Sequence, residues 1–167
     1  LVYDSFCVTA TNIPFVPTQD GAIYNPGFED SAAGTVMAFI DFWTGLGDAG
    51  AVDSTYAHSG ANSLKIFYPG TLVQQDWAAT ATYKYASSGF VYSASSDRMA
   101  GDDAVALLVL QFLDANTNVL ISYTSEMFTP TSPADAWTLL QSVGVAPQGT
   151  VMGRTLVGLV GHGTNYA

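Results

Sequence analysis

The chain has 167 residues, of which 49% are hydrophobic and 13% aromatic, and it carries a formal net charge of −10. Its four basic residues are too few and too scattered to displace the counterions of a nucleic acid or to hold an anionic lipid surface, which excludes both as partners. The single cysteine, Cys7, excludes an intrachain disulfide.

The first twenty residues differ from the rest of the sequence. Residues 1–20 contain two prolines and no clean alternation of apolar and polar side chains. We expect this segment to be an N-terminal arm that wraps its own domain, a linker, or a strand given to a neighbouring copy. The folded domain is then expected to span residues 21–167.

From residue 21 onward, short runs of β-branched and aromatic residues alternate with turn sequences, and helical periodicity is almost absent. Turns are predicted at Tyr68-Pro69-Gly70 and Ser87-Ser88-Gly89. The strands that we predict span residues 21–25, 36–43, 50–56, 63–68, 71–85, 89–96, 104–114, 118–127, 136–145 and 153–160. Many short strands at close spacing indicate an all-β protein, an antiparallel β-sandwich of the jelly-roll type.

Several motifs follow one another in an order that is typical of one family. NPGFE comes first, then HSGANSLKI, QQDW, LLVLQFLDANTNVL and FTPTSPADAWTLL. This series resembles the jelly-roll carbohydrate-binding modules that are appended to xylanases and laminarinases, which have a galactose-binding-like β-sandwich. The resemblance covers roughly residues 21–165. It implies a non-catalytic domain that binds a polysaccharide, and together with the scarcity of lysine it favours an extracellular protein, secreted or at the cell surface.

The resemblance also implies a structural calcium ion. In such modules the Glu after Gly-Phe reaches a calcium between the N-terminal strand and the His-Ser-Gly turn, and calcium accepts six to eight oxygen ligands. Here Glu29 would be the side-chain ligand, with carbonyl oxygens from Gly27 and from the turn that runs from Ser59 to Asn62. In the alternative, Glu29 accepts backbone N–H bonds from that turn and no ion is needed.

A binding face is predicted on the strand at residues 71–85. If this strand is unbroken, its odd positions share one face that carries aromatic and amide side chains. Aromatic rings stack on the flat faces of sugars, and amides bond sugar hydroxyls. The predicted ligand-binding residues on this concave face are Gln75, Trp77, Tyr83, Tyr85, Gln111 and Tyr123. The other two tryptophans, Trp43 and Trp137, are expected in the core.

No catalytic constellation accompanies these residues, so we expect no enzyme activity. His58 and His162 lack the spacing of a metal pair or a catalytic triad. Glycosidases need two carboxylates, but Asp102 and Asp103 are adjacent in a turn, where their side chains diverge.

The C-terminus suggests a second hypothesis. Modules of the resembling family usually close with a further strand that bears an Asp pair, and this sequence stops at GHGTNYA, where that strand should begin. Either the sequence is truncated there or the strand is supplied from elsewhere. An open edge is then expected beside residues 104–114 or 153–160, with Leu156 and Leu159 poorly covered. The alternative function is an extracellular structural or filament subunit that self-associates by strand exchange through residues 1–20.

Overall fold

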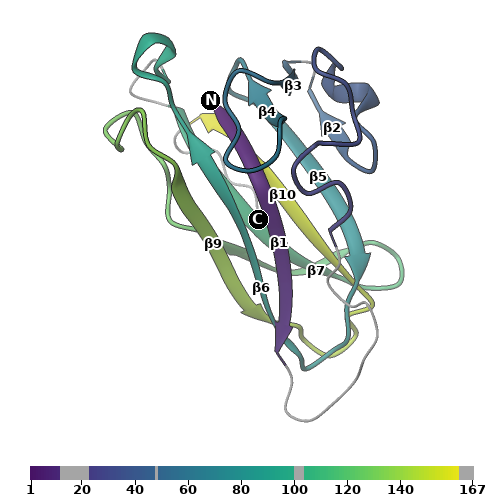
Figure 1. Cartoon of the computed structure of the whole chain (residues 1–167). Helices are drawn as coiled ribbons and strands as arrows, with labels where there is room; N and C mark the ends of the chain where they lie inside the picture. Colours follow the sequence, from purple (N-terminus) through teal and green to yellow (C-terminus); the bar gives the residue numbers. More distant parts are fainter. Residues whose placement is uncertain (12–22, 48, 100–103, 162–167) are drawn as a thin grey trace.

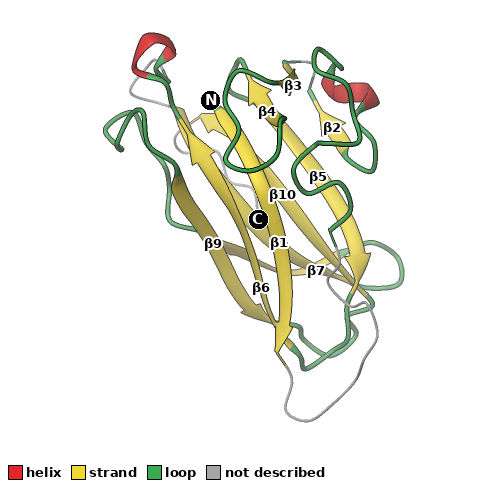
Figure 2. Cartoon of the chain, viewed as in Figure 1, coloured by secondary structure: helices red, strands yellow, loops and turns green. Residues whose placement is uncertain are grey.

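The computed structural model describes residues 1–11, 23–47, 49–99 and 104–161, and these residues form an all-β sandwich (Figures 1 and 2). Two five-stranded antiparallel sheets pack against each other: sheet A has the order β3-β4-β1-β6-β9, and sheet B has the order β2-β5-β10-β7-β8. The predicted antiparallel β-sandwich is therefore confirmed. The strands are β1 (Val2–Thr11), β2 (Thr44–Leu46), β3 (Gly50–Asp53), β4 (Ser63–Ile66), β5 (Thr71–Ala78), β6 (Lys84–Tyr92), β7 (Ala104–Leu113), β8 (Val119–Thr124), β9 (Thr138–Val145) and β10 (Met152–Gly161).

The only helical turns in the described part of the chain are two short 3₁₀ segments, η1 (Met37–Phe39) and η2 (Ser95–Asp97). The strand predicted over residues 36–43 is therefore wrong, since η1 occupies its first half and Trp43 N–H bonds back to the carbonyl of Ile40 at 3.3 Å. None of the described segments is a helix long and apolar enough to span a membrane.

The N-terminal segment belongs to the sandwich. β1 lies in the middle of sheet A and pairs antiparallel with β4 on one side and with β6 on the other. Tyr3 is fully buried, and its hydroxyl donates to the carbonyl of Gly158 in the opposite sheet at 2.6 Å. The described part of this segment, residues 1–11, therefore packs against strands of its own chain. The boundary expected after residue 20 lies outside the described residues.

The open edge expected near the C-terminus is not found where it was predicted. β10 pairs with β5 and β7, and β7 pairs with β10 and β8, so both are interior strands. Leu156 and Leu159 are 8% and 4% exposed. Leu159 belongs to the main core cluster, and Leu156 to a second cluster that contains Leu107. The edge strands are β3 and β9 in sheet A and β2 and β8 in sheet B.

The strand expected over residues 71–85 is broken into two. β5 ends at Ala78, and the chain turns through Thr82, which has a left-handed φ of 72°. Thr82 N–H donates to the carbonyl of Ala146 at 2.7 Å, which holds the turn against the start of the β9–β10 connection. β6 then begins at Lys84 in the other sheet, so the residues before and after the turn do not share one face of one strand.

The core fills the space between the two sheets. Alternate residues of β7 such as Ala106 and Leu108 point inward, and they meet Tyr3, Phe28 and Trp43 in the main cluster. Trp43 is 5% exposed and its indole N–H donates to the carbonyl of Asn25 at 3.0 Å, which confirms its prediction as a core residue. The other face of β7 contributes Val105, Leu107 and Val109 to a separate buried cluster.

Candidate functional site

Two of the predicted binding residues, Trp77 and Tyr85, lie inside the sandwich. Trp77 is 5% exposed and Tyr85 is fully buried, with their ring centroids 5.1 Å apart. Trp77 Nε1 donates to Thr155 Oγ1 at 3.2 Å, and the indole fills the space over Gly153 of the neighbouring strand, where any Cβ would collide with it. Their expected place on an exposed face is therefore wrong. β5 alternates as predicted, but its odd positions face the other sheet.

Gln75 is also buried, and it serves the protein's own loops. Its Oε1 accepts the N–H of Tyr24 at 2.7 Å, and its Nε2 donates to the carbonyls of Tyr24 at 2.9 Å and Phe42 at 3.0 Å. All of these partners are backbone groups of the segment between β1 and β2. Gln75 is thus a bridge inside the fold.

The remaining predicted residues do not join Gln75 and Trp77 on one surface. Gln111 is paired in register with Arg154, so both lie on the face of sheet B opposite to Gln75. Its Nε2 donates to Ser122 Oγ at 3.1 Å. Tyr83 and Tyr123 are half-buried and pack against the cluster that contains Trp77. The expectation that Gln111 faces the same side as Gln75 is wrong, because the pleat places odd residues of β7 and β5 on different faces.

An aromatic cluster instead covers the outer face of sheet A. Its rings come from β6, from the segment after β3 and from the residue before β9; the imidazole is exposed and the other rings are half-buried. We name it the aromatic surface, and its members are Tyr56, His58, Phe90, Tyr92 and Trp137. His58 lies parallel to Phe90 with centroids 3.7 Å apart and meets Trp137 edge-on at 5.5 Å. Tyr92 contacts both Tyr56, at 4.8 Å, and Trp137, at 5.1 Å, so the rings form one continuous surface.

Trp137 belongs to this surface and not to the core, so its core prediction is wrong. The even residues of β6 point outward while Tyr85, Ser87, Gly89 and Val91 are buried, and Trp137 precedes β9, the strand that pairs with β6. The sequence SSGFVY contains the signal, since Phe90 and Tyr92 alternate with Gly89 and Val91. Both sets are apolar, however, and the sequence does not tell which set faces out.

A carboxylate borders the aromatic surface. Asp135 has a left-handed φ of 58°, and its N–H donates to the carbonyl of Ser93 at 2.9 Å. Its Oδ1 accepts the N–H of Ser95 at 2.8 Å and the hydroxyl of Tyr92 at 3.4 Å. The hydrogen bonds from Ser95 lower the pKa of Asp135, while desolvation and the charge of Asp135 raise the pKa of Tyr92. A charged acceptor and a neutral phenol therefore lie side by side.

Two carboxylates hold the turn that carries His58. Asp4 Oδ2 accepts the N–H of His58 at 2.6 Å and of Ser59 at 3.0 Å. Glu29 Oε1 accepts the N–H of Ala61 at 3.0 Å and of Asn62 at 2.9 Å. The backbone N–H bonds that the alternative predicts for Glu29 are therefore present in the structure. These bonds fix the backbone of the turn, and with it the imidazole that stacks on Phe90.

Sequence reasoning misses Asp4, because this residue lies in the segment that was expected to be an arm. Asp4 is fully buried, and desolvation raises the pKa of its carboxyl although backbone N–H groups of Ser59, His58 and Ser5 act in the opposite direction. Its signal in the sequence is a lone acid in an apolar run, LVYDSF.

The residues predicted as calcium ligands gather around one pocket. A pocket of about 370 Å³ is lined by Gly27, Glu29 and Ser59 among others. A Cβ at Gly27 would lie 3.3 Å from Asp4 Oδ1 and 3.6 Å from Glu29 Oε1, so both carboxylates border the same spot. Asn62 belongs to the turn, but its amide Nδ2 donates to the carbonyl of Ser31 at 3.2 Å.

The described residues offer no further metal-binding cluster of side chains. No group of three or more His, Cys, Asp or Glu side chains within the described ranges is arranged to hold a metal ion. Asp102, Asp103 and His162, the other residues considered for catalysis, lie outside the described residues.

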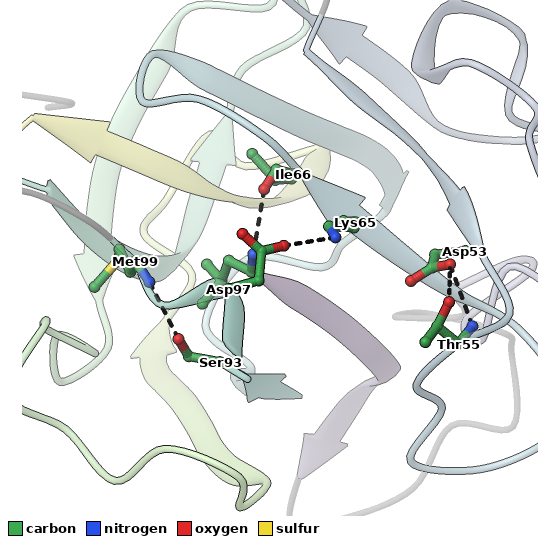
Figure 3. A network of polar contacts seen from close by, with 8 residues as sticks. Asp53, Thr55, Lys65, Ile66, Ser93, Asp97 and Met99 are labelled. Carbon is green, nitrogen blue, oxygen red and sulfur yellow. Dashed lines mark hydrogen bonds and ion pairs between the residues drawn. The ribbon is translucent and has the colours of Figure 1, made fainter. Parts of the chain in front are cut away.

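A separate polar network joins η2 to β4 (Figure 3). Lys65 Nζ lies 2.7 Å from Asp97 Oδ2, and this pairing raises the pKa of Lys65 and lowers that of Asp97. Met99 N–H donates to Ser93 Oγ at 3.3 Å nearby. A pocket of about 440 Å³ with Tyr68 in its wall adjoins the pair. Because Asp97 neutralises the Lys65 cation, this pocket offers a ligand little charge from the pair.

Comparisons with known proteins place the fold. No protein-family model and no curated protein matches the sequence. The chain is similar to the C-terminal family 22 carbohydrate-binding module of Clostridium thermocellum Xyn10B, with a TM-score of 0.56 and 19% identity over 87% of this chain and 88% of the module. It is also similar to the enzymatically active domain of tailspike protein 4 of bacteriophage CBA120, with a TM-score of 0.56 and 10% identity over 83% of this chain. The match spans only 19% of the tailspike chain. The resemblance to jelly-roll carbohydrate-binding modules is thus confirmed for the fold.

Proposed function

We propose that this protein is a non-catalytic domain that binds a polysaccharide on the aromatic surface of sheet A. The observation that carries the proposal is the set of rings around Phe90 and Trp137, which lie in mutual contact and next to the charged Asp135. Rings of this kind offer flat apolar faces to the C–H faces of sugars, and a carboxylate accepts bonds from sugar hydroxyls. His58 is engaged in ring contacts in this arrangement, which supports binding over catalysis.

The charge of the protein narrows the ligand to a neutral polysaccharide. With a net charge of −10, the chain repels polyanions. A neutral glycan meets no electrostatic repulsion as it approaches the protein. Its repeated sugar rings can stack on a surface made of several aromatic groups. Such a ligand fits a secreted or cell-surface location. The fold adds support, because conserved amino acids in a cleft of the similar Xyn10B module have a role in ligand binding by that module.

Affinity electrophoresis tests the proposal. We expect at least one soluble neutral polysaccharide, a β-glucan, an unsubstituted xylan or an unsulfated marine galactan, to retard the wild-type protein. Trp137→Ala should weaken this retardation on the order of tenfold, because it removes the largest ring of the surface. Tyr68→Ala is the matched control, since Tyr68 is 67% exposed and belongs to another part of the molecule. Absence of retardation by every polysaccharide, with a folded protein, would contradict the proposal.

We further propose that a calcium ion stabilises the turn beneath the aromatic surface. The support is the chemistry of the donors, since the carboxylates of Asp4 and Glu29 border the same spot beside Gly27 and a pocket adjoins them. Calcium prefers oxygen ligands of this kind, including carbonyls of turns such as those of Gly27 and Ser59. A bound ion would offset the repulsion between the two carboxylates. Hydrogen bonds already join Asp4 of β1 to His58 of the turn, and Glu29 to Asn62.

A further inference from the structure

We propose that Tyr24 and Phe42 form a second sugar-stacking site, and that buried Gln75 is its positioning residue. This inference rests on the proposed function, because it assigns the same class of ligand to a different part of the surface. Tyr24 and Phe42 come from the segment between β1 and β2, whereas the aromatic surface lies on the outer face of sheet A.

The two rings form a stacked pair that is open to solvent. Their centroids are 5.5 Å apart with an interplanar angle of 27°. Tyr24 is 53% exposed and Phe42 is 61% exposed, although neighbouring Trp43 and Asn25 are buried. Exposed large rings that are held in contact with each other mark binding sites more often than scattered ones do. The pair presents a ready face for a pyranose ring.

Gln75 fixes both ring-bearing segments from below. Its side-chain amide makes three hydrogen bonds to backbone groups, two with Tyr24 and one with the carbonyl of Phe42. Gln75 is 5% exposed and comes from β5, so the rings are tied to a strand inside sheet B. Because this buried amide makes all of these hydrogen bonds to the backbone at Tyr24 and Phe42, it holds the two ring-bearing stretches in one relative position.

The backbone at the pair is strained, which agrees with a positioned site. Phe42 has a left-handed φ of 68° and Asn25 one of 48°, a region that is costly for residues with a Cβ. Additional bonds hold this conformation: Asn25 Nδ2 donates to the carbonyl of Asp41 at 3.3 Å, and the Trp43 indole donates to the carbonyl of Asn25 at 3.0 Å. The loops therefore cross-brace each other around the two rings.

The ligand of this site is a sugar ring of the same neutral polysaccharide. Asp41 is exposed beside Phe42 and offers a carboxylate to sugar hydroxyls, as Asp135 does at the aromatic surface. Two weak sites on one domain raise the affinity for a long chain through effective concentration, provided that the chain can reach both. Short oligosaccharides gain nothing from this effect, so polymer and oligomer distinguish a second site from a single one.

The test uses the full chain and the polysaccharide that retards the wild type, together with short oligosaccharides of the same sugar. Tyr24→Ala/Phe42→Ala should lower the affinity for the polymer on the order of tenfold and reduce the oligosaccharide stoichiometry in calorimetry from two sites to one. Tyr68→Ala is again the control. If the double variant binds both ligands as the wild type does, the second site is refuted while the proposed function stands. If the wild type binds neither polysaccharide nor oligosaccharide, both the proposed function and the second site are refuted.

Gln75→Glu tests the positioning role. It keeps the size and the acceptor of the side chain but places an oxygen against the carbonyls of Tyr24 and Phe42. We expect it to lower polymer affinity as Phe42→Ala does, yet to cause no further loss in the Tyr24→Ala/Phe42→Ala background. An equal loss of polymer affinity in the wild-type and the Tyr24→Ala/Phe42→Ala backgrounds would refute the positioning role. If Gln75→Glu does not fold, Gln75→Met, which only removes the bonds, takes its place in the same cycle.

Discussion

At the scale of single residues, the three tryptophans differ in what their removal should cost. Trp77→Ala should destabilise the fold by about 3–5 kcal/mol, because it empties a site in the core between the sheets. Trp137→Ala should cost roughly 1 kcal/mol, since its ring is half-buried on the outer face of sheet A. Urea unfolding of both variants measures the difference. Equal decreases in the free energy of unfolding, or a larger decrease for Trp137→Ala, would contradict the placement of these rings.

Glu29 is the residue at which the calcium proposal is decided. If the ion binds only the folded state, calcium at ~100 times its dissociation constant should add about 2.7 kcal/mol of stability. Melting curves in calcium and in a chelator measure this difference, and Glu29→Gln should remove most of it. Identical midpoints for the wild type in both solutions would leave the hydrogen bonds to Ala61 and Asn62 as the whole role of Glu29.

At the scale of elements, β1 is the strand whose loss should matter most. It lies between β4 and β6, so its removal leaves two strands with unpaired backbone edges and takes Tyr3 and Phe6 out of the core. Deleting residues 1–11 should abolish cooperative unfolding and lead to aggregation. Circular dichroism and size-exclusion chromatography of the shortened chain are the measurements. A soluble, equally stable monomer would show that β1 is dispensable.

The elements also show what the sequence can and cannot predict. β7, β9 and β10 lie within a few residues of their predicted bounds, because long apolar runs with clear flanking turns define them. β1 is missing from the strands predicted for the domain, because Pro14 and Pro17 make residues 1–20 look irregular, although Val2–Thr11 is rich in β-formers. The strand predicted at 71–85 fails at Thr82, where a left-handed turn occurs without glycine or proline.

The predicted binding site fails for a different physical reason. Alternation along a strand separates two faces, but it does not tell which face is inside when both carry apolar or aromatic residues. The predicted face of residues 71–85 is inverted at Trp77 and Tyr85, which are buried. Phe90 and Tyr92 of β6, for which no face was predicted, point outward. The contact between Glu29 and the Ser59–Asn62 turn is predicted better, because both belong to recognisable local sequence patterns. Its partner Asp4 requires the long-range pairing of β1 with β4.

At the scale of the whole molecule, charge sets how the protein should respond to salt. The net charge of −10 leaves the surface with few cations, and the described ion pairs of Lys65 with Asp97 and of Arg154 with Asp76 neutralise some of them. Ring stacking on a neutral glycan involves no ion pair. Its affinity should therefore change little between about 0.01 M and about 1 M salt, where the screening length falls from about 30 Å to about 3 Å.

A sulfated or uronic polysaccharide should behave in the opposite way. Repulsion by the acidic surface should suppress its binding at low salt, and screening should relieve that repulsion as salt rises. Calorimetric titration of neutral and anionic glycans across this salt range separates the two cases. Binding of a polyanion that is tight at low salt and weakens steeply as salt is added would require a cationic site, and would contradict recognition by the aromatic surface.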